Sequence, residues 1–159
     1  MVLMGTENNS KKEIIIPTES IRFRVIANSN EEIDIASKQN LKDYMEDIVY
    51  DLIRNSTNKE EANKIIVDNF DYLNKKIYEY LKTDNYSLDF GVNYFPRKIY
   101  KGVIYEEGMY DSLVITLGNG KGKNWWCVLF PPLCLLEENT TTTDVEYQLF
   151  ISRIINNFR

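Results

Sequence analysis

The sequence predicts an α+β domain: a single domain in which a largely antiparallel sheet carries a helical hairpin and a C-terminal helix. Three observations lead to this fold class. Apolar and polar residues alternate near residue 21 and again between 86 and 130, apolar residues recur at helical spacing over 33–81, and another helical pattern covers 147–158. Strands and helices that follow one another in blocks are typical of an antiparallel sheet covered by helices.

The 159 residues fit one domain with a single core. Residues 1–13 show no sustained periodicity and are predicted to be mobile, although the isoleucines at 14–16 can begin to dock. Residues 20–159 form the predicted α+β domain. No apolar run reaches the roughly 20 residues needed to span a bilayer, so the chain as given is expected to be soluble.

Composition argues against several classes of function. The formal net charge of −5 is unlike that of a general nucleic-acid binder, which would be basic. The chain contains no histidine, so it lacks the commonest general base and the commonest transition-metal ligand. We therefore expect no catalysis, no metal, no cofactor and no small-molecule substrate.

The first predicted strand begins at residue 21. Alternate residues along it are apolar, and those between them are mostly polar. The apolar set is Ile21, Phe23, Val25 and Ala27, and the other set is Arg22, Arg24, Ile26 and Asn28. This alternation predicts a strand with one buried face. The polar residues 28–30 supply turn and helix-cap chemistry after it.

Two helices are predicted next. Apolar residues at helical spacing mark the first helix over 33–54, and the polar run 55–58 ends it. Asn58 followed by Glu61 has the capping-box pattern, so the second helix begins there and continues to Leu81. The short connection favours an antiparallel helical hairpin.

Three strands and a helix complete the predicted domain. Residues 86–94 alternate most clearly, and 113–117 lead into glycines at 118, 120 and 122. A phosphate-binding loop needs a helix after its glycines, whereas an apolar run follows here, so the glycines predict a hairpin turn to a strand at 124–130. Pro131 and Pro132 end that strand. Thr143 and Glu146 repeat the capping-box pattern before the C-terminal helix.

Trp125 and Trp126 are adjacent in a predicted strand and must therefore project to opposite faces of the sheet. One face would hold Trp125, Cys127 and Leu129, and the other would hold Trp126, Val128 and Phe130. A central strand covered on both sides explains the pair most simply. The functional alternative is that one face stays open as a binding hot spot, a role in which tryptophan is enriched.

Cys127 and Cys134 allow three interpretations. A structural disulfide is the favoured one, followed by two buried thiols and by exchange with a cysteine of a partner. A nucleophilic cysteine needs a base or a cation to form its thiolate, and no histidine is present. If the two cysteines bridge each other, the domain works in an oxidising, extracytoplasmic setting.

Arg22 and Arg24 lie on the less apolar side of the first strand, close to Asn28. They could pair with nearby carboxylates at the surface, or they could make a fork-shaped contact with a carboxylate of a partner. The sequence leaves both possibilities open. The carboxylate pairs at 31–32 and 106–107 are consecutive and do not indicate a two-carboxylate active site.

Four stretches carry a resemblance to a known family. They are Asn124–Cys134, Ile21–Ser29, Gly91–Lys98 and Gly108–Leu113, and the Trp-Trp-Cys run is the most specific of them. In this order, over residues 20–136, the chain resembles the stage II sporulation protein R family, which comprises signalling proteins of endospore-forming bacteria. Family members generally carry an N-terminal hydrophobic export segment, so the resemblance implies that one precedes the domain. Residues 1–19 would then be a disordered linker or a vector remnant, and residues 20–159 the signalling domain.

The resemblance also implies a function. The protein would be made in the forespore, secreted into the intermembrane space between forespore and mother cell, and would bind and activate a membrane-embedded aspartic protease of the mother cell. That protease would then mature the early mother-cell sigma factor. The residues expected to contact the partner are Asn124, Trp125, Trp126, Arg22, Arg24 and Asn28.

Two other classes of function are compatible with the sequence. One is an extracytoplasmic hydrolase acting on a cell-envelope polymer, which would require convergent acidic residues that the sequence does not display. The other is a structural module that self-associates through an exposed tryptophan face. Activity of the isolated domain would reveal the first, and a concentration series would reveal the second.

Overall fold

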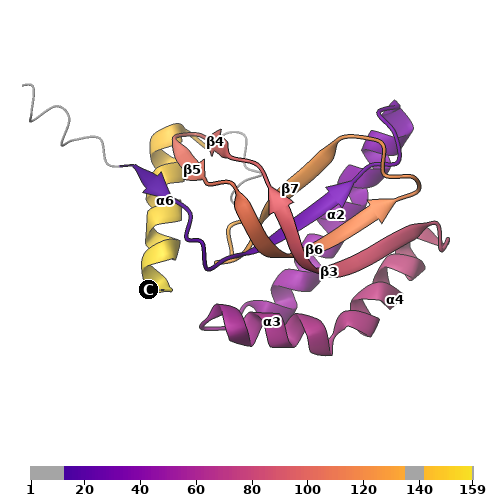
Figure 1. Ribbon diagram of the computed structural model, residues 1–159, viewed down its shortest axis with the longest axis horizontal. Helices are drawn as coiled ribbons and strands as arrows, with labels where there is room; N and C mark the ends of the chain where they lie inside the picture. The colour runs from indigo at the N-terminus through magenta and orange to yellow at the C-terminus, as the bar shows by residue number, and fades with distance from the viewer. Residues whose placement is uncertain (1–12, 135–141, 159) are drawn as a thin grey trace, which may run out of the picture.

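The computed structural model describes residues 13–134 and 142–158, and it confirms the fold class as a single α+β domain (Figure 1). These residues form two mixed sheets and four helices. The elements in chain order are β1 (Ile14–Ile15), β2 (Ile21–Ile26), α2 (Glu32–Ile53), α3 (Lys59–Asp68), α4 (Phe70–Leu81), β3 (Tyr86–Phe95), β4 (Lys98–Tyr100), β5 (Val103–Tyr105), β6 (Gly108–Leu117), β7 (Asn124–Phe130) and α6 (Asp144–Asn157).

The larger sheet has the strand order β3-β6-β2-β7. β2 pairs with β6 in parallel and with β7 antiparallel. The predicted hairpin between residues 113–117 and 124–130 is therefore wrong, because β2 lies between the two strands. Arg22 and Phe23, on opposite faces of β2, are both fully inaccessible. The prediction of a single buried face is thus also wrong, and a strand covered on both faces belongs inside a sheet.

The loop 118–123 crosses the end of β2 instead of turning back beside β6. Its main chain bonds to the segment that follows β2, where the N–H of Lys121 donates to the carbonyl of Asn28 at 3.0 Å. A Cβ atom on Gly122 would lie 2.3 Å from the carbonyl oxygen of Ser29. Only glycine permits this close approach of two main chains.

Helix α2 matches the first predicted helix, whereas the second predicted helix is divided into α3 and α4. The two meet at Asn69, whose φ of −109° and ψ of 16° leave the helical region. The Asn69 side chain donates to the carbonyl of Ile65 at 2.8 Å, the kind of local bond by which asparagine competes with a continuous helix. The predicted cap of α3 is confirmed, because the Asn58 side chain accepts from the N–H of Glu61 at 2.8 Å.

Helices α2, α3 and α4 cover one face of the larger sheet, and the smaller sheet and α6 lie against the opposite face at one end (Figure 1). The smaller sheet has the order β1-β5-β4. A second apolar cluster joins α6 to this sheet and to β7; its members include Val103, Tyr105, Val128, Tyr147 and Ile151. The C-terminal helix therefore docks as predicted, and the capping box of Thr143 and Glu146 is present.

The N-terminal part of the described chain takes part in the fold. Ile14 and Ile15 form β1, which pairs with β5 in parallel. Ile16 is fully buried in the second cluster. Residues 14–16 of the predicted linker over 1–19 thus take part in the fold, and residues 1–12 lie outside the described residues.

Candidate binding site around Trp126

The register of β2 against β7 brings the predicted site residues together. Arg24 lies opposite Trp126, and Ile26 lies opposite Asn124. Arg22, Arg24 and Trp126 share the face of the sheet that carries the smaller sheet, whereas Trp125 projects toward α2. The prediction that the two tryptophans point to opposite faces is confirmed.

Trp125 closes the core below α2. Its ring meets Phe23 edge to face, with the ring centroids 5.9 Å apart. The ammonium group of Lys42, on α2, lies 4.4 Å from the centre of the Trp125 ring. Trp125 is half-buried, so its indole is a packing element with one exposed side.

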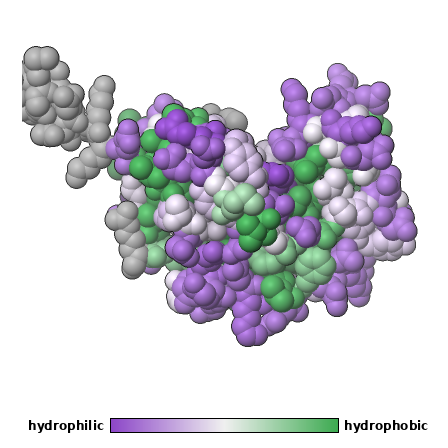
Figure 2. All heavy atoms as spheres, in the orientation of Figure 1, coloured by the Kyte–Doolittle hydropathy of each residue, from purple (hydrophilic) through white to green (hydrophobic). Residues whose placement is uncertain are grey.

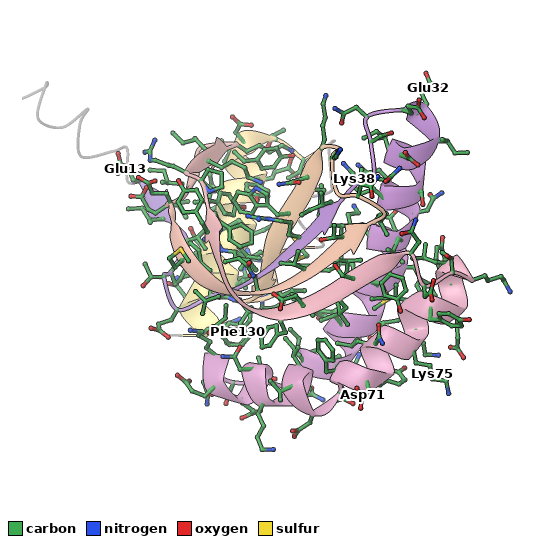
Figure 3. The ribbon with its side chains drawn as sticks, turned by 45° about the vertical axis from the view of Figure 1, so that its right-hand side comes forward. Glu13, Glu32, Lys38, Asp71, Lys75 and Phe130 are labelled. Atoms are coloured by element: carbon green, nitrogen blue, oxygen red, sulfur yellow. A yellow bond between two sulfur atoms is a disulfide. The ribbon has the colours of Figure 1, made fainter. Side chains whose placement is uncertain are left out.

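Trp126 joins the two sheets. Its indole meets the rings of Phe95 and Tyr105 edge to face, with centroids 5.3 and 5.7 Å away. The ammonium group of Lys98, on β4, lies 4.1 Å from the ring centre, a distance at which a cation and an indole attract each other. Figure 3 shows ring side chains gathered between the two sheets on this side of the molecule.

Arg22 lies beneath this cluster and is fully inaccessible. Its guanidinium carbon is 3.9 Å from the ring centre of Tyr110 and 5.1 Å from that of Trp126, and its Nε donates to Ser20 Oγ at 3.3 Å. The interpretation of Arg22 as a surface charge is therefore wrong. Arg22 packs beneath the aromatic rings of the site. Because these rings cover it, Arg22 cannot contact a partner directly.

Arg24 is half-buried at the border of the same face. Its Nη2 donates to the carbonyl of Tyr94 at 2.6 Å, and its guanidinium carbon lies 4.0 Å from the ring centre of Phe95. Burial lowers the pKa of Arg24. The side chain thus extends across β6 toward β3, and it ties the centre of the sheet to the β3 edge.

A groove runs beside the N-terminal half of β7. It encloses about 320 Å³ and is lined by Lys98, Tyr100, Asn124, Trp125 and Trp126. In the space-filling view, the surface is hollowed between the part that contains β4 and β5 and the part that contains the start of α2 (Figure 2). Trp126 is therefore both a packing residue and a wall of an open groove. The interpretation of its strand as a central one is wrong, because β7 is the last strand of the larger sheet among the described residues. The role of the tryptophans in binding a partner stays a prediction.

The side chain of Asn28 makes structural hydrogen bonds within the protein. Its Nδ2 donates to Asp34 at 2.9 Å, and its Oδ1 accepts from the N–H of Asn119 at 2.8 Å. Hydrogen bonds from Ser29 and Asn28 lower the pKa of Asp34. The side chain of Asn28 thus links the crossing loop to α2, and Asn28 is not among the residues that line the groove.

Cys127 and Cys134 form a disulfide with their Cα atoms 5.1 Å apart, as favoured from the sequence. The bridge closes a turn in which the N–H of Leu133 donates to the carbonyl of Val128 at 3.1 Å. One prediction about this strand is wrong: Phe130 joins Leu129 in the core below α2, instead of sharing the face of Trp126. A bulge opposite Ile21 adds one residue to β7 and turns Phe130 to the other face.

A buried carboxyl lies close to the disulfide. Glu46 of α2 is 1% exposed, and neither of its carboxyl oxygens has a hydrogen-bond partner within the described residues. Burial raises the pKa of Glu46 to about 7, although Lys42, with its Nζ 4.0 Å away, acts in the opposite direction. Glu46 lines a small cavity together with Tyr50 and Cys134.

Sequence reasoning missed Lys98, Tyr100, Phe95 and Tyr105 as parts of the site. Lys98, Tyr100 and Tyr105 come from β4 and β5, which have only three residues each, and Phe95 is the last residue of β3. The β-branched and aromatic residues on both sides of the Lys101–Gly102 turn were the available signal. Among residues 13–134 and 142–158, no group of three or more His, Cys, Asp or Glu residues is arranged to hold a metal ion. Over the same ranges, no helix is long and apolar enough to cross a membrane.

Comparison with known proteins gives two matches. The family model of stage II sporulation protein R matches residues 17–140. The stage II sporulation protein R of Bacillus subtilis (strain 168) is 34% identical over 135 residues, which cover 82% of this chain and 60% of that protein. The chain thus corresponds to about 60% of the length of this curated relative. No solved structure matches.

Proposed function

The chain belongs to the stage II sporulation protein R family, and from this premise we propose that it is a secreted sporulation signal that binds and activates a membrane-embedded aspartic protease. The protease, in the mother cell, then removes the pro-sequence of the early mother-cell sigma factor. The domain acts by binding and contributes no catalytic group to the cleavage.

The disulfide supports an extracytoplasmic place of action. Cys127 and Cys134 are bridged, and disulfides persist in oxidising compartments. The intermembrane space between forespore and mother cell lies outside both cytoplasms. A signal that works there meets the extracytoplasmic face of a protease embedded in the mother-cell membrane.

The observation that carries the proposal is the open groove beside Trp126. A half-buried indole with a cation 4.1 Å from its ring centre, standing in the wall of a groove of about 320 Å³, has the composition of a protein-binding hot spot. A ligand that binds the active arrangement of a protease more tightly than the inactive one shifts the population toward activity. Binding alone is then sufficient to trigger cleavage.

A reconstitution tests the proposal. The purified protein is added outside vesicles that display the extracytoplasmic face of the candidate protease and enclose the pro-sigma substrate. The protease preparation is first confirmed to be competent on a soluble peptide. We expect the wild type to trigger cleavage and Trp126→Ala to need a concentration about 30-fold higher or more, the loss typical of a hot-spot residue.

Two further variants make the result specific. Tyr100→Ala alters the groove from β4 and serves in place of Trp126→Ala if thermal unfolding shows that the latter is not folded. Val92→Ala is the matched control, because Val92 is 60% exposed on β3 at the opposite edge of the sheet. Failure of the wild type with a competent protease would overturn the proposed function. If only Val92→Ala lost protease activation, the contact surface would have to lie on β3 and not at the groove.

A further inference from the structure

The free edge of β7 points to how the partner is bound. Among the described residues, β7 is the last strand of the larger sheet and pairs with β2 alone. Its N-terminal half, Asn124–Trp126, is also the part that lines the groove. An exposed strand edge presents unpaired N–H and C=O groups, which are a template for another strand.

The hydrogen bonds at the two ends of β7 define which main-chain groups face outward. The carbonyl of Lys123 accepts from the N–H of Ala27 at 3.3 Å and so points toward the β2 side. Because a trans peptide places C=O and N–H on opposite sides, the N–H of Asn124 points away from β2. Outward groups recur every second residue in an antiparallel pair, so the N–H and C=O of Trp126 also face the free edge.

The outward main-chain groups of β7 differ in whether another part of the chain already forms a hydrogen bond with them. The carbonyl of Val128 faces the same edge and accepts from the N–H of Leu133 at 3.1 Å, so the disulfide-closed turn covers that end. In the part of the chain that the structure describes, no hydrogen bond reaches the outward main-chain groups of Asn124 or Trp126. The open length of edge is therefore the segment that the groove follows.

The charges around the groove restrict what can lie in it. Its lining within the described residues includes Lys98 and no acidic residue. The exposed Lys123 directly precedes Asn124 at the end of the groove, and Lys121, also exposed, lies two residues before Lys123 in the chain. The chain as a whole has a net charge of −5, so this basic edge is a local exception. A complementary occupant carries carboxylates.

We propose that an extended, acidic segment of the partner adds to β7 as a fifth strand, a mode that rests on the proposed function and specifies its contact. The main chain of that segment pairs with Asn124 and Trp126. Alternate side chains of the segment pack against the Trp126 indole and Tyr100, and its carboxylates lie near Lys121 and Lys123. Main-chain pairing supplies affinity, and the groove supplies selectivity.

Proline provides a direct test, because it removes one N–H and leaves the rest of the strand in place. Asn124→Pro removes only an outward N–H at the first residue of an edge strand, where proline is tolerated. Asn124→Ala removes the same side chain and keeps the N–H, so it is the matched control. In the vesicle assay we expect Asn124→Pro to lower activation about tenfold or more relative to Asn124→Ala at sub-saturating concentration, because both variants lack the asparagine side chain and only the proline lacks the N–H.

A second readout is residue-resolved amide exchange of the wild type with and without protease vesicles. The amides of Asn124 and Trp126 should gain protection on binding, whereas those of Trp125 and Cys127, which face β2, should be protected in both samples. Wild-type activation with equal activity of Asn124→Pro and Asn124→Ala would overturn strand addition and leave the proposed function standing. An Asn124→Pro effect on self-association alone, seen by sedimentation, would overturn it too, because the occupant would then be a second copy.

Discussion

Replacing Glu46 by glutamine should make the protein more stable at alkaline pH and leave it almost unchanged in acid. The carboxyl is 1% exposed, has no hydrogen-bond partner within the described residues, and has a pKa raised to about 7 by burial. In the unfolded chain the same group ionises near its ordinary value of 4.5. Folding therefore favours the protonated form.

The sign and size of the effect follow from proton linkage. Between the two pKa values the folded state binds more protons than the unfolded state, so the free energy of unfolding falls as pH rises. The full difference in pKa corresponds to about 3 kcal/mol, and about 2.5 kcal/mol of it is lost between pH 5 and pH 8. Loss of the attraction between Glu46 and Lys42 reduces the gain in the variant, because their charged atoms lie 4.0 Å apart.

Urea unfolding of the wild type and Glu46→Gln at pH 5, 6.5 and 8 measures this difference. The advantage of the variant should be small at pH 5 and should grow by about 2 kcal/mol at pH 8, which is about 4 to 8 °C in the unfolding temperature of a domain of this size. Parallel pH profiles of the two proteins would refute the argument. Such a result would mean that Glu46 ionises in the folded protein at its ordinary pKa.

The other predictions concern the disulfide and the crossing loop. Removal of the bridge by a Cys127→Ser/Cys134→Ser double substitution should cost about 2.5 kcal/mol in the chain-entropy account of so short a loop. Thermal unfolding of the wild type with and without a reductant checks this value, and equal stability in all samples would contradict it. Gly122→Ala should lower the free energy of unfolding by more than about 2 kcal/mol, because the new Cβ would lie 2.3 Å from the main-chain oxygen of Ser29. Gly91→Ala is its control: the nearest atom lies 3.7 Å from the added Cβ, so a loss as large as that of Gly122→Ala would show that the clash is not the cause.

Local patterns predicted the elements of this fold well and their pairing poorly. The alternation from Ile21 and the helical spacing of α2 were correctly assigned because each depends on residues close in sequence. The place of β2 between β6 and β7 depends on which long-range pair buries more surface, and no local pattern encodes that choice. The glycine loop fitted a hairpin in length and composition, whereas its main chain bonds to the segment after β2.

The candidate site was predicted in the same uneven way. Trp126 and Arg24 were chosen as candidate contacts because tryptophan is enriched in binding hot spots and arginine can make a fork-shaped contact with a carboxylate. Arg22 has the same residue type and the same face, yet the smaller sheet covers it completely. Lys98 and Tyr100 complete the groove from a strand of three residues, too short to give a periodic signal. A site built between two sheets requires the topology before its second wall can be assigned.

The turn closed by the disulfide covers one end of the outer edge of β7, and the groove follows the other end. The bridge from Cys127 to Cys134 holds the turn that covers Val128, and it leaves the stretch from Asn124 to Trp126 open. A fully open edge of seven residues would invite pairing between copies of the protein, which short edges and charged borders oppose. A short open stretch beside Trp126, with lysines at its border, admits one extended segment of complementary charge. The disulfide thus shortens the open edge of β7. The short edge opposes pairing between copies of the protein and leaves one position for the proposed partner segment.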